Sequence, residues 1–342
     1  MSHWPFVKRL LPIVALALLL AGCGAPELSA LNPSGAVAEK QLSLIILSIS
    51  IMVLVFVVVA IIFTYVVIRY RERPGQEKEI PVQVEGNHKL EIIWTVIPIL
   101  LLIVLAVPTV MTTFSLAEEA PEDAFWVDVT AHQYWWNFEY PDTNIVTAQE
   151  LVIPTGERVY INLESADVIH SFWVPALAGK MDTNPDNTNK MYIETDTPGI
   201  YDGRCAELCG EAHALMNFRV VALEPAEYNN WVAGMQNFDE EVVSAQATEG
   251  RELFAQSCIG CHAVDASQPG LGPNLAGFAE RGTIAGFLAK SSDNPEEADA
   301  NLKAWIKEAQ AVKPGNAMPN FLDLNDQELD AIVEYLNSLT LD

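Results

Sequence analysis

Three long apolar stretches occupy the first third of the chain, and polar residues dominate the rest. The first stretch, residues 10–21, follows two basic residues and is too short to cross a bilayer. The second and third carry no charge over residues 41–68 and 92–117. Each exceeds the roughly 20 apolar residues that a membrane-spanning helix needs. The pattern predicts transmembrane helices at 42–68 and 91–117.

The short first stretch has the features of a secretory signal peptide, with basic residues ahead of an apolar core. It ends in Leu-Ala-Gly-Cys at residues 20–23, which resembles the lipobox of bacterial lipoproteins. The resemblance implies a signal peptide at residues 1–22 and lipidation of Cys23. The alternative is an ordinary short apolar run with a chance cysteine.

Basic residues cluster between the two predicted spans. That loop holds three arginines and two lysines, whereas the outer flanks offer only Lys40 before the spans and nothing basic after them until Arg158. Because basic loops stay in the cytoplasm, everything after Glu118 should be exported, as the signal peptide also predicts. The chain is therefore expected to be a multi-pass protein of a bacterial cell membrane with an extracytoplasmic soluble part.

The exported part changes character along its length. Short β-rich runs with turn signals between them fill residues 125–223, which predicts a β-sandwich or barrel. Helical patterns follow at 249–257, 298–311 and 325–339, and the last has Glu328 at the capping-box position. The expected domains are a β-domain at 120–236, an acidic linker at 237–246 and a helical domain at 247–342.

The formal net charge of −26 comes from the exported part. From Glu118 onward there are 38 acidic and 11 basic residues, whereas the first 117 residues are nearly neutral. Such a field argues against binding to nucleic acid or anionic lipid and attracts basic partners. Acidity that serves solubility alone is the alternative.

Two cysteines lie close in sequence to a histidine and a methionine in the β-rich part. Cys205 and Cys209 are followed by His213 and then by Met216. Outside the membrane a cysteine pair usually forms a disulfide, and that alternative stays open. Thiolate, imidazole and thioether are the ligands of copper electron-transfer sites, and a second thiolate lets two copper ions share bridging sulfurs. One more nitrogen ligand is needed from a separate loop, and His170 is the best candidate.

These motifs and the helical hairpin resemble subunit II of cytochrome c oxidase over about residues 42–225. The resemblance implies a cupredoxin-like β-sandwich with a binuclear copper A centre. The side chain of Glu207 falls where the family places a magnesium ligand at the interface with subunit I. Zinc competes for a Cys₂His₂ set, but it would leave the methionine unexplained. By resemblance the copper A ligands are His170, Cys205, the carbonyl of Glu207, Cys209, His213 and Met216.

A Cys-x-x-Cys-His motif formed by Cys258, Cys261 and His262 is the signature of covalent haem attachment. The thiols bond the haem vinyl groups, and the histidine becomes the proximal iron ligand. No histidine follows in the sequence, and the only later methionine, Met318, is therefore the predicted sixth ligand. With Gly-Pro-Asn-Leu at 272–275, this part resembles the class I cytochromes c.

The aromatic run Tyr134, Trp135 and Trp136 resembles the part of the oxidase subunit where soluble cytochrome c delivers electrons. The family commonly has tryptophan at the position of Tyr134, and the departure is sensible if the donor haem is tethered. A strand that simply packs, or lies near the membrane interface, is the alternative.

Glu91 lies at the cytoplasmic end of the second predicted span. A carboxylate there invites a role in proton uptake, and the resemblance implies the same, since the family has a glutamate at the mouth of a proton channel. The alternative is a helix N-terminal acid that the macrodipole favours.

Together the motifs resemble a caa-type haem–copper oxidase subunit II: a multidomain membrane protein with a two-helix transmembrane hairpin, a cupredoxin-like β-sandwich and an all-α cytochrome c domain. The expected function is electron transfer from a donor through haem c to copper A and on to subunit I, which reduces oxygen to water coupled to proton pumping. Expected partners are subunit I, subunit III and a donor that is a basic or neutral cytochrome, a copper protein or a respiratory complex.

Other functions are possible for the same motifs. A copper A subunit of a nitric oxide reductase and a free-standing membrane-bound electron carrier remain alternatives. A nitrous oxide reductase needs more histidines than the six present, and a quinol oxidase subunit would lack the copper ligands. The hairpin, the haem motif and Met216 argue against a copper chaperone. Oxygen reduction itself must occur on another chain, because nothing here builds an open haem–copper pocket.

Overall fold

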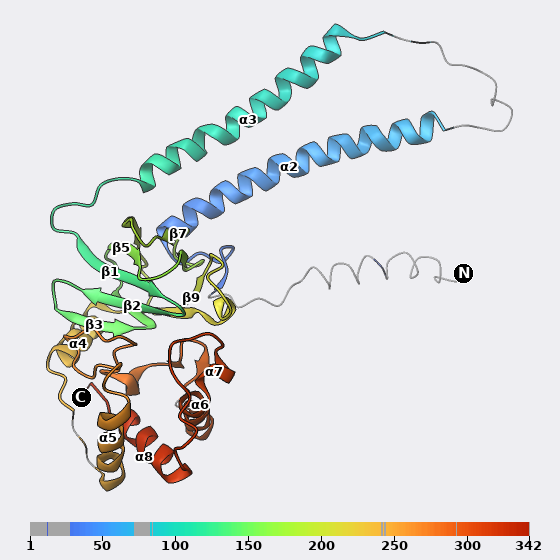
Figure 1. The fold of residues 1–342 in the computed structure, drawn as a ribbon. Helices are drawn as coiled ribbons and strands as arrows, with labels where there is room; N and C mark the ends of the chain where they lie inside the picture. The colour runs from blue at the N-terminus through green and yellow to red at the C-terminus, as the bar shows by residue number, and fades with distance from the viewer. Residues whose placement is uncertain are drawn as a thin grey trace, which may run out of the picture.

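The computed structural model describes residues 12, 28–71, 83, 85–240, 242, 244–291 and 293–341 (Figure 1). The predicted signal peptide, apart from Pro12, and Cys23 lie outside the described residues. The described chain forms two long helices, then a β-domain (residues 125–236), then a C-terminal domain (residues 245–341).

The two long helices are α2 (Ala36–Arg69) and α3 (His88–Leu116), and both are long and apolar enough to cross a membrane. Their large apolar side chains are exposed along most of their length, which suits a lipid environment. At the start of α3 the Asn87 side chain accepts hydrogen bonds from two backbone amides, which caps the helix. Both helices extend from the same side of the β-domain (Figure 1).

The beginning of α2 is hydrogen-bonded to the β-domain. The amides of Ser34 and Gly35 donate to the carbonyl of Ala176 over 2.7 and 3.1 Å, and the amide of Ala38 donates to Leu177 over 3.1 Å. A Cβ on Gly35 would lie 2.6 Å from the Leu177 carbonyl oxygen, so only glycine fits this close approach. The segment ahead of the first span is therefore part of the β-domain surface.

The β-domain is a sandwich of two five-stranded sheets, as the β-rich pattern predicted. One sheet has the order β3-β2-β1-β5-β8, and the other has the order β4-β10-β9-β6-β7. Apolar residues alternate along β1 and β10, and the inward-facing ones form the core with large aromatic side chains. The strands are β1 (Phe125–His132), β2 (Trp135–Tyr140), β3 (Ile145–Ala148), β4 (Glu150–Pro154), β5 (Val159–Ser165), β6 (His170–Trp173), β7 (Lys180–Thr183), β8 (Asn189–Ile193), β9 (Gly199–Cys205) and β10 (Asn217–Leu223).

Helix α4 (Pro225–Gln236) completes the β-domain, and the C-terminal domain follows. In the C-terminal domain α5 packs on α8, and Phe254 meets Tyr335 with ring centroids 5.3 Å apart. The capping box predicted at Asn325 and Glu328 is confirmed. The elements are α5 (Ala245–Ser257), η3 (Phe278–Glu280), β11 (Thr283–Ile284), β12 (Leu288–Ala289), α6 (Pro295–Lys307), α7 (Ala309–Val312) and α8 (Asp326–Asn337).

The prediction of one helix over 298–311 is wrong, because the chain leaves the helical conformation at Glu308 (φ −133°, ψ 47°). The break lets the Lys307 carbonyl accept a hydrogen bond from the amide of Phe321 over 3.2 Å. A tertiary contact with the following loop thus replaces helical continuity at this point.

The C-terminal domain is docked on the β-domain, on the side away from the two long helices (Figure 1). The amide of Val146 donates to the carbonyl of Ala266 over 2.7 Å, and the amide of Gly282 donates to the buried carboxylate of Glu150 over 2.9 Å. Ala266 and Ala276 are buried in the same apolar cluster as the β-domain core. Direct contacts, as well as the linker, therefore join the two domains.

Candidate functional site

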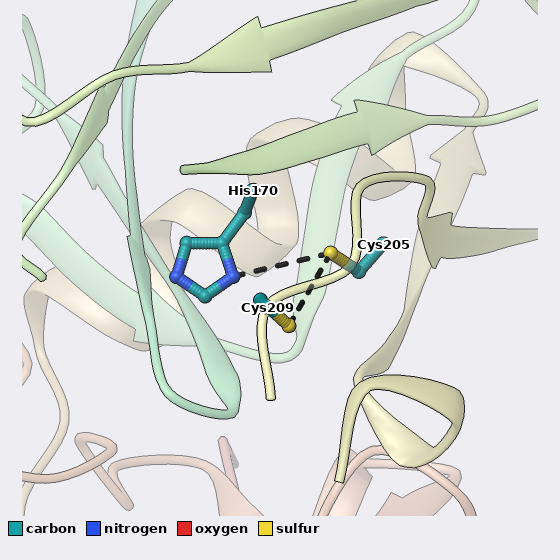
Figure 2. Close-up of side chains that lie close together, drawn as sticks. All are labelled: His170, Cys205 and Cys209. Atoms are coloured by element: carbon teal, nitrogen blue, oxygen red, sulfur yellow. Dashed lines mark hydrogen bonds between the residues drawn. The ribbon is translucent and has the colours of Figure 1, made fainter. Parts of the chain in front are cut away.

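The predicted metal ligands meet at one end of the sandwich, where β6 begins and β9 ends. His170 is the first residue of β6, and Cys205 is the last residue of β9. These strands are paired, with Phe172 opposite Cys205, so the sheet brings together residues that lie far apart in sequence. Figure 2 shows His170, Cys205 and Cys209 pointing toward one another.

The ligand atoms of these three residues all lie within 4.8 Å of one another, and all three residues are buried. The Cys205 and Cys209 sulfurs are 3.8 Å apart, and both cysteines are free. The alternative of a disulfide is therefore absent from this structure. His170 Nδ1 lies 3.9 Å from the Cys205 sulfur, which is the arrangement of a metal site.

The other three predicted ligands lie around the same two sulfurs. His213 Nδ1 is 3.6 Å and the sulfur of Met216 3.8 Å from the sulfur of Cys209. The carbonyl oxygen of Glu207 is 3.2 Å from the sulfur of Cys205. The structure thus brings together all six predicted ligands, with the two cysteines at the centre.

Asp167 orients His170 and was not predicted from the sequence. Its carboxylate lies 2.7 Å from His170 Nε2, which leaves Nδ1 facing the cysteines. The same carboxylate accepts a 2.6 Å hydrogen bond from the amide of Gln133 in the β1–β2 turn. Burial lowers the pKa of His170, but hydrogen bonds with Cys205 and Asp167 outweigh it, and the net shift is upward. A carboxylate behind a ligating histidine is typical of metal sites.

The hydrogen bond from the Cys209 thiol holds the pKa of Cys205 down at about 3, well below that of a free thiol, and His170 adds to this effect. Cys205 is therefore the thiol that ionises first, and thiolates are the form that binds metal. Two thiolates, two imidazoles, a buried thioether and a carbonyl suit copper, and a zinc site would not need the thioether. The residues present fit a binuclear copper centre.

The β1–β2 turn lies against the loop that carries these cysteines. The Gln133 side chain donates to the carbonyl of Cys209 over 2.6 Å, and the amide of Glu211 donates to the Tyr134 hydroxyl over 3.1 Å. Tyr134 is buried, and Trp136 is fully buried with its ring centroid 6.2 Å from that of His170. This turn is thus in direct contact with the cluster.

Trp135 has a different environment from its two neighbours. It is half-buried and stacks on His132, with ring centroids 4.2 Å apart and an angle of 7° between the rings. Burial lowers the pKa of His132, so its neutral form is favoured beside the tryptophan.

The predicted haem-attachment motif follows the end of α5. The amides of Cys261 and His262 both donate to the carbonyl of Cys258, which makes a tight turn. His262 Nδ1 lies 2.8 Å from the carbonyl of Pro273, and this leaves Nε2 free for a metal. Burial lowers the pKa of His262 and favours the neutral, ligating form. A Cβ on Gly272 would lie 3.2 Å from the His262 ring, so the chain must pass close there.

Met318 lies in a loop held by side-chain hydrogen bonds. Asn316 Oδ1 accepts from the Met318 amide over 2.7 Å, and Gln310 Nε2 donates to the Met318 carbonyl over 2.7 Å. Ile259, inside the motif, Leu271, next to Gly272, and Leu322, four residues after Met318, are 52, 82 and 61 % exposed. A covalently attached macrocycle would cover such surface, so the residues present fit a haem.

Glu91 lies in the first turn of α3, with its carboxylate 3.2 Å from His88 Nδ1. Its backbone amide donates to the carbonyl of Asn87, the capping residue. This placement at a helix N-terminus suits the macrodipole as well as a proton path.

Comparison with known proteins agrees with the architecture. Family models match three parts of the chain: the transmembrane domain of cytochrome c oxidase subunit II (residues 29–111), its periplasmic domain (144–223) and cytochrome c (247–340). Fold and site thus define a membrane-anchored electron-transfer protein with a copper A domain and a cytochrome c domain.

The relatives extend over almost the whole chain. Cytochrome c oxidase subunit 2 of Bacillus sp. (strain PS3) is 52% identical over 96% of both chains, and that of Alkalihalophilus pseudofirmus is 46% identical over 99% of both. The solved periplasmic domain of cytochrome oxidase subunit II from Bradyrhizobium japonicum is 28% identical and covers 33% of this chain and 94% of that one, with a TM-score of 0.32. This chain belongs to the cytochrome c oxidase subunit II family and is a subunit of that oxidoreductase.

Proposed function

We propose that this subunit receives electrons in its C-terminal domain, passes them to its β-domain and delivers them to subunit I of the oxidase. Oxygen would be reduced to water there, coupled to proton pumping. When bound, haem c and copper A supply centres that accept and release single electrons with little rearrangement. The chain's own residues hold these centres, exclude water from them and fix their relative position. Subunit III is a further expected partner.

The observation that carries this proposal is the docking of the C-terminal domain over Tyr134. The backbone at Gly315, three residues before Met318, passes so close that a Cβ there would lie 3.4 Å from the Tyr134 hydroxyl. The same hydroxyl also contacts Gly210 and Glu211, which follow Cys209. The residue at the family's usual receiving position is thus buried between the two proposed centres.

This placement accounts for the difference from the family at Tyr134. A tryptophan that receives electrons from a soluble donor must be accessible, but this side chain is only 5% exposed. Because the C-terminal domain covers it, an external donor would react with the haem and not with the β-domain. A tethered domain also has a high effective concentration, roughly millimolar for a short flexible linker.

The order of reduction tests the proposal. A basic cytochrome c reduced by a flash should transfer electrons to haem c first, and copper A should follow. From Asp239 onward the chain has 18 acidic and 6 basic residues, so the bimolecular rate should fall as ionic strength rises. The two absorbance changes are followed in the assembled oxidase, with the same flash at high salt as the control. Reduction of copper A ahead of haem c would refute the proposal.

Glu91 is proposed to take part in proton uptake. Glu91→Gln keeps the size of the side chain and removes its charge, so turnover of the assembled oxidase should fall severalfold while haem and copper contents stay normal. Glu85→Gln, a change in the preceding segment, is the matched control and should have no effect. Equal turnover of the two variants across pH would favour a role in helix capping alone.

Lipidation of Cys23 is proposed from the sequence motif. The mass of the mature N-terminus should correspond to a diacylglyceryl-modified Cys23 as the first residue. An intact Met1, or a free thiol at residue 23, would contradict it. Because two spans already hold the protein, Cys23→Ala should leave it in the membrane.

A further inference from the structure

A lysine is buried at the contact between the two domains, and the function proposed above gives it no role. Lys313 immediately follows α7 and is 2% exposed. Its ammonium nitrogen donates to the Tyr134 carbonyl over 2.7 Å and to the Ala285 carbonyl over 2.8 Å. One acceptor belongs to the β-domain and the other to the C-terminal domain. A single side chain thus joins the two domains by hydrogen bonds.

The surroundings of Lys313 are unusual for a charged group. Within the described part of the chain no ion pair links it to a carboxylate, and the ring centroid of Phe287 lies 5.5 Å from its nitrogen. Burial lowers the pKa of Lys313 to about 7, so its charged form depends on the few acceptors it finds. Undocking would remove the Tyr134 carbonyl, one of its two acceptors.

Hydrogen bonds connect the backbone of Lys313 to the loop that carries Met318. The Asn316 side chain donates to the carbonyls of Ala309 and Lys313 over 2.9 and 2.5 Å, and its oxygen accepts from the amide of Met318. Gln310 donates to the carbonyls of Asn316 and Met318, each over 2.7 Å. These contacts make residues 309–318 a single braced unit.

On the other side, the Tyr134 carbonyl belongs to a turn that is braced on the cysteine loop. Gln133 donates to the Cys209 carbonyl, and the Tyr134 hydroxyl accepts from the amide of Glu211. The hydrogen bond from Lys313 therefore connects two stiff loops, one at each proposed centre.

We infer that Lys313 is a positioning residue that fixes the C-terminal domain on the β-domain and holds the Met318 loop against Tyr134. The C-terminal domain then stays in one docked position and does not undock and move about on its linker. The docked position sets the rate of transfer between the centres, and in this respect the inference rests on the proposed function.

Hydrogen exchange in the full-length protein within its oxidase tests the docking directly. The Val146 and Gly282 amides donate across the domain contact, and both lie far from Lys313 in sequence. In Lys313→Met their protection should fall by about tenfold or more, because the hydrogen bond across the domain contact is lost and the buried Tyr134 carbonyl is left unpaired. Peptides from β10 and α8 should keep their protection, and the haem and copper spectra should be unchanged.

Lys307→Met is the matched control, because Lys307 is a half-buried lysine of the same domain that pairs with Asp326 and not with the β-domain. It should leave protection at both amides unchanged. Lys313→Gln keeps a hydrogen-bond donor and loses the ammonium group, so its protection at the two amides should lie between those of the wild type and Lys313→Met. If Lys313→Met does not fold, Lys313→Gln is used in its place. Transfer from haem c to copper A should slow in the same order, with unchanged reduction potentials.

Unchanged protection at Val146 and Gly282 in the Lys313 variants would overturn the inference, whatever the transfer rate. An equal loss of protection in Lys307→Met would also overturn it. The proposed function is judged separately, by the order in which the two centres are reduced. The two can therefore fail independently.

Discussion

Cys209→Ser should reduce the copper content from two ions per chain to one or none and leave the haem spectrum intact. Cys209 lies at the centre of the cluster, with Cys205, His213 and Met216 all within 3.8 Å of its sulfur. Serine does not ionise at neutral pH, so it cannot replace a thiolate that bridges two metals. Cys205→Ser should have the same effect.

The consequence for turnover is large. Changing a residue that only orients a metal ligand lowers metal affinity or activity by about 10–100-fold. Loss of a bridging ligand should therefore reduce donor-driven turnover by more than about 100-fold. Metal analysis of the purified oxidase, with the visible spectrum, measures both effects. The control is Ser171→Ala, because the Ser171 hydroxyl is buried, has no hydrogen-bond partner within the described residues and is not a ligand. Two copper ions retained in Cys209→Ser would contradict the binuclear site.

The same metal analysis tests the proposed magnesium role of Glu207. This side chain is exposed beside Asp182, Leu208 and Cys209 at the rim of a surface hollow. In the complex with subunit I, Glu207→Gln should lower the magnesium content without changing the copper content, since copper would use the Glu207 carbonyl, which the change retains. An unchanged magnesium content would refute the assignment.

Met318→Ala should lower the reduction potential of the haem by on the order of 100 mV or more, because axial ligands set haem potentials over a range of about 0.8 V. The loop should keep its conformation, since its hydrogen bonds use the backbone of residue 318 and the side chains of Asn316 and Gln310. Electron transfer from the external donor should slow as the haem becomes a weaker acceptor.

Redox titration of the purified oxidase measures this potential, and the copper content should stay at two ions. Met191→Ala is the matched control, a half-buried methionine in β8 of the other domain. An unchanged haem potential in Met318→Ala would show that another residue is the sixth ligand.

The sequence predicted most of the side chains that the structure brings together in this cluster, because they lie close together along the chain. Five of the six predicted ligands, four of them side chains, lie within residues 205–216, so their spacing alone indicates the chemistry. His170 could be added because the site lacked a nitrogen ligand. Asp167 could not be found in this way, because an acidic residue three positions before a histidine in an acidic protein has no distinguishing pattern.

The docking of the two domains could not be predicted from the sequence, and the reason is physical. In the sequence nothing distinguishes Lys313 from an ordinary surface lysine. It is buried only because two domains with separate sequence patterns pack against each other. The break at Glu308 has the same origin. The helix ends where the Phe321 amide donates to the Lys307 carbonyl, and the local sequence carries no signal for this end. Local patterns predicted elements and ligands, and contacts between distant segments decided how they meet.

The attachment of Ser34, Gly35 and Ala38 to the β-domain has a consequence for how the protein is made. These residues leave the ribosome long before the β6–β7 turn that they bind, and both spans lie between them and the exported domains in the sequence. If the N-terminal tail stayed in the cytoplasm, the Ala176 and Leu177 carbonyls would have no partner from it. Translocation of the tail must therefore precede the last step of β-domain assembly. Only a correctly inserted chain can complete the hydrogen bonds of this domain.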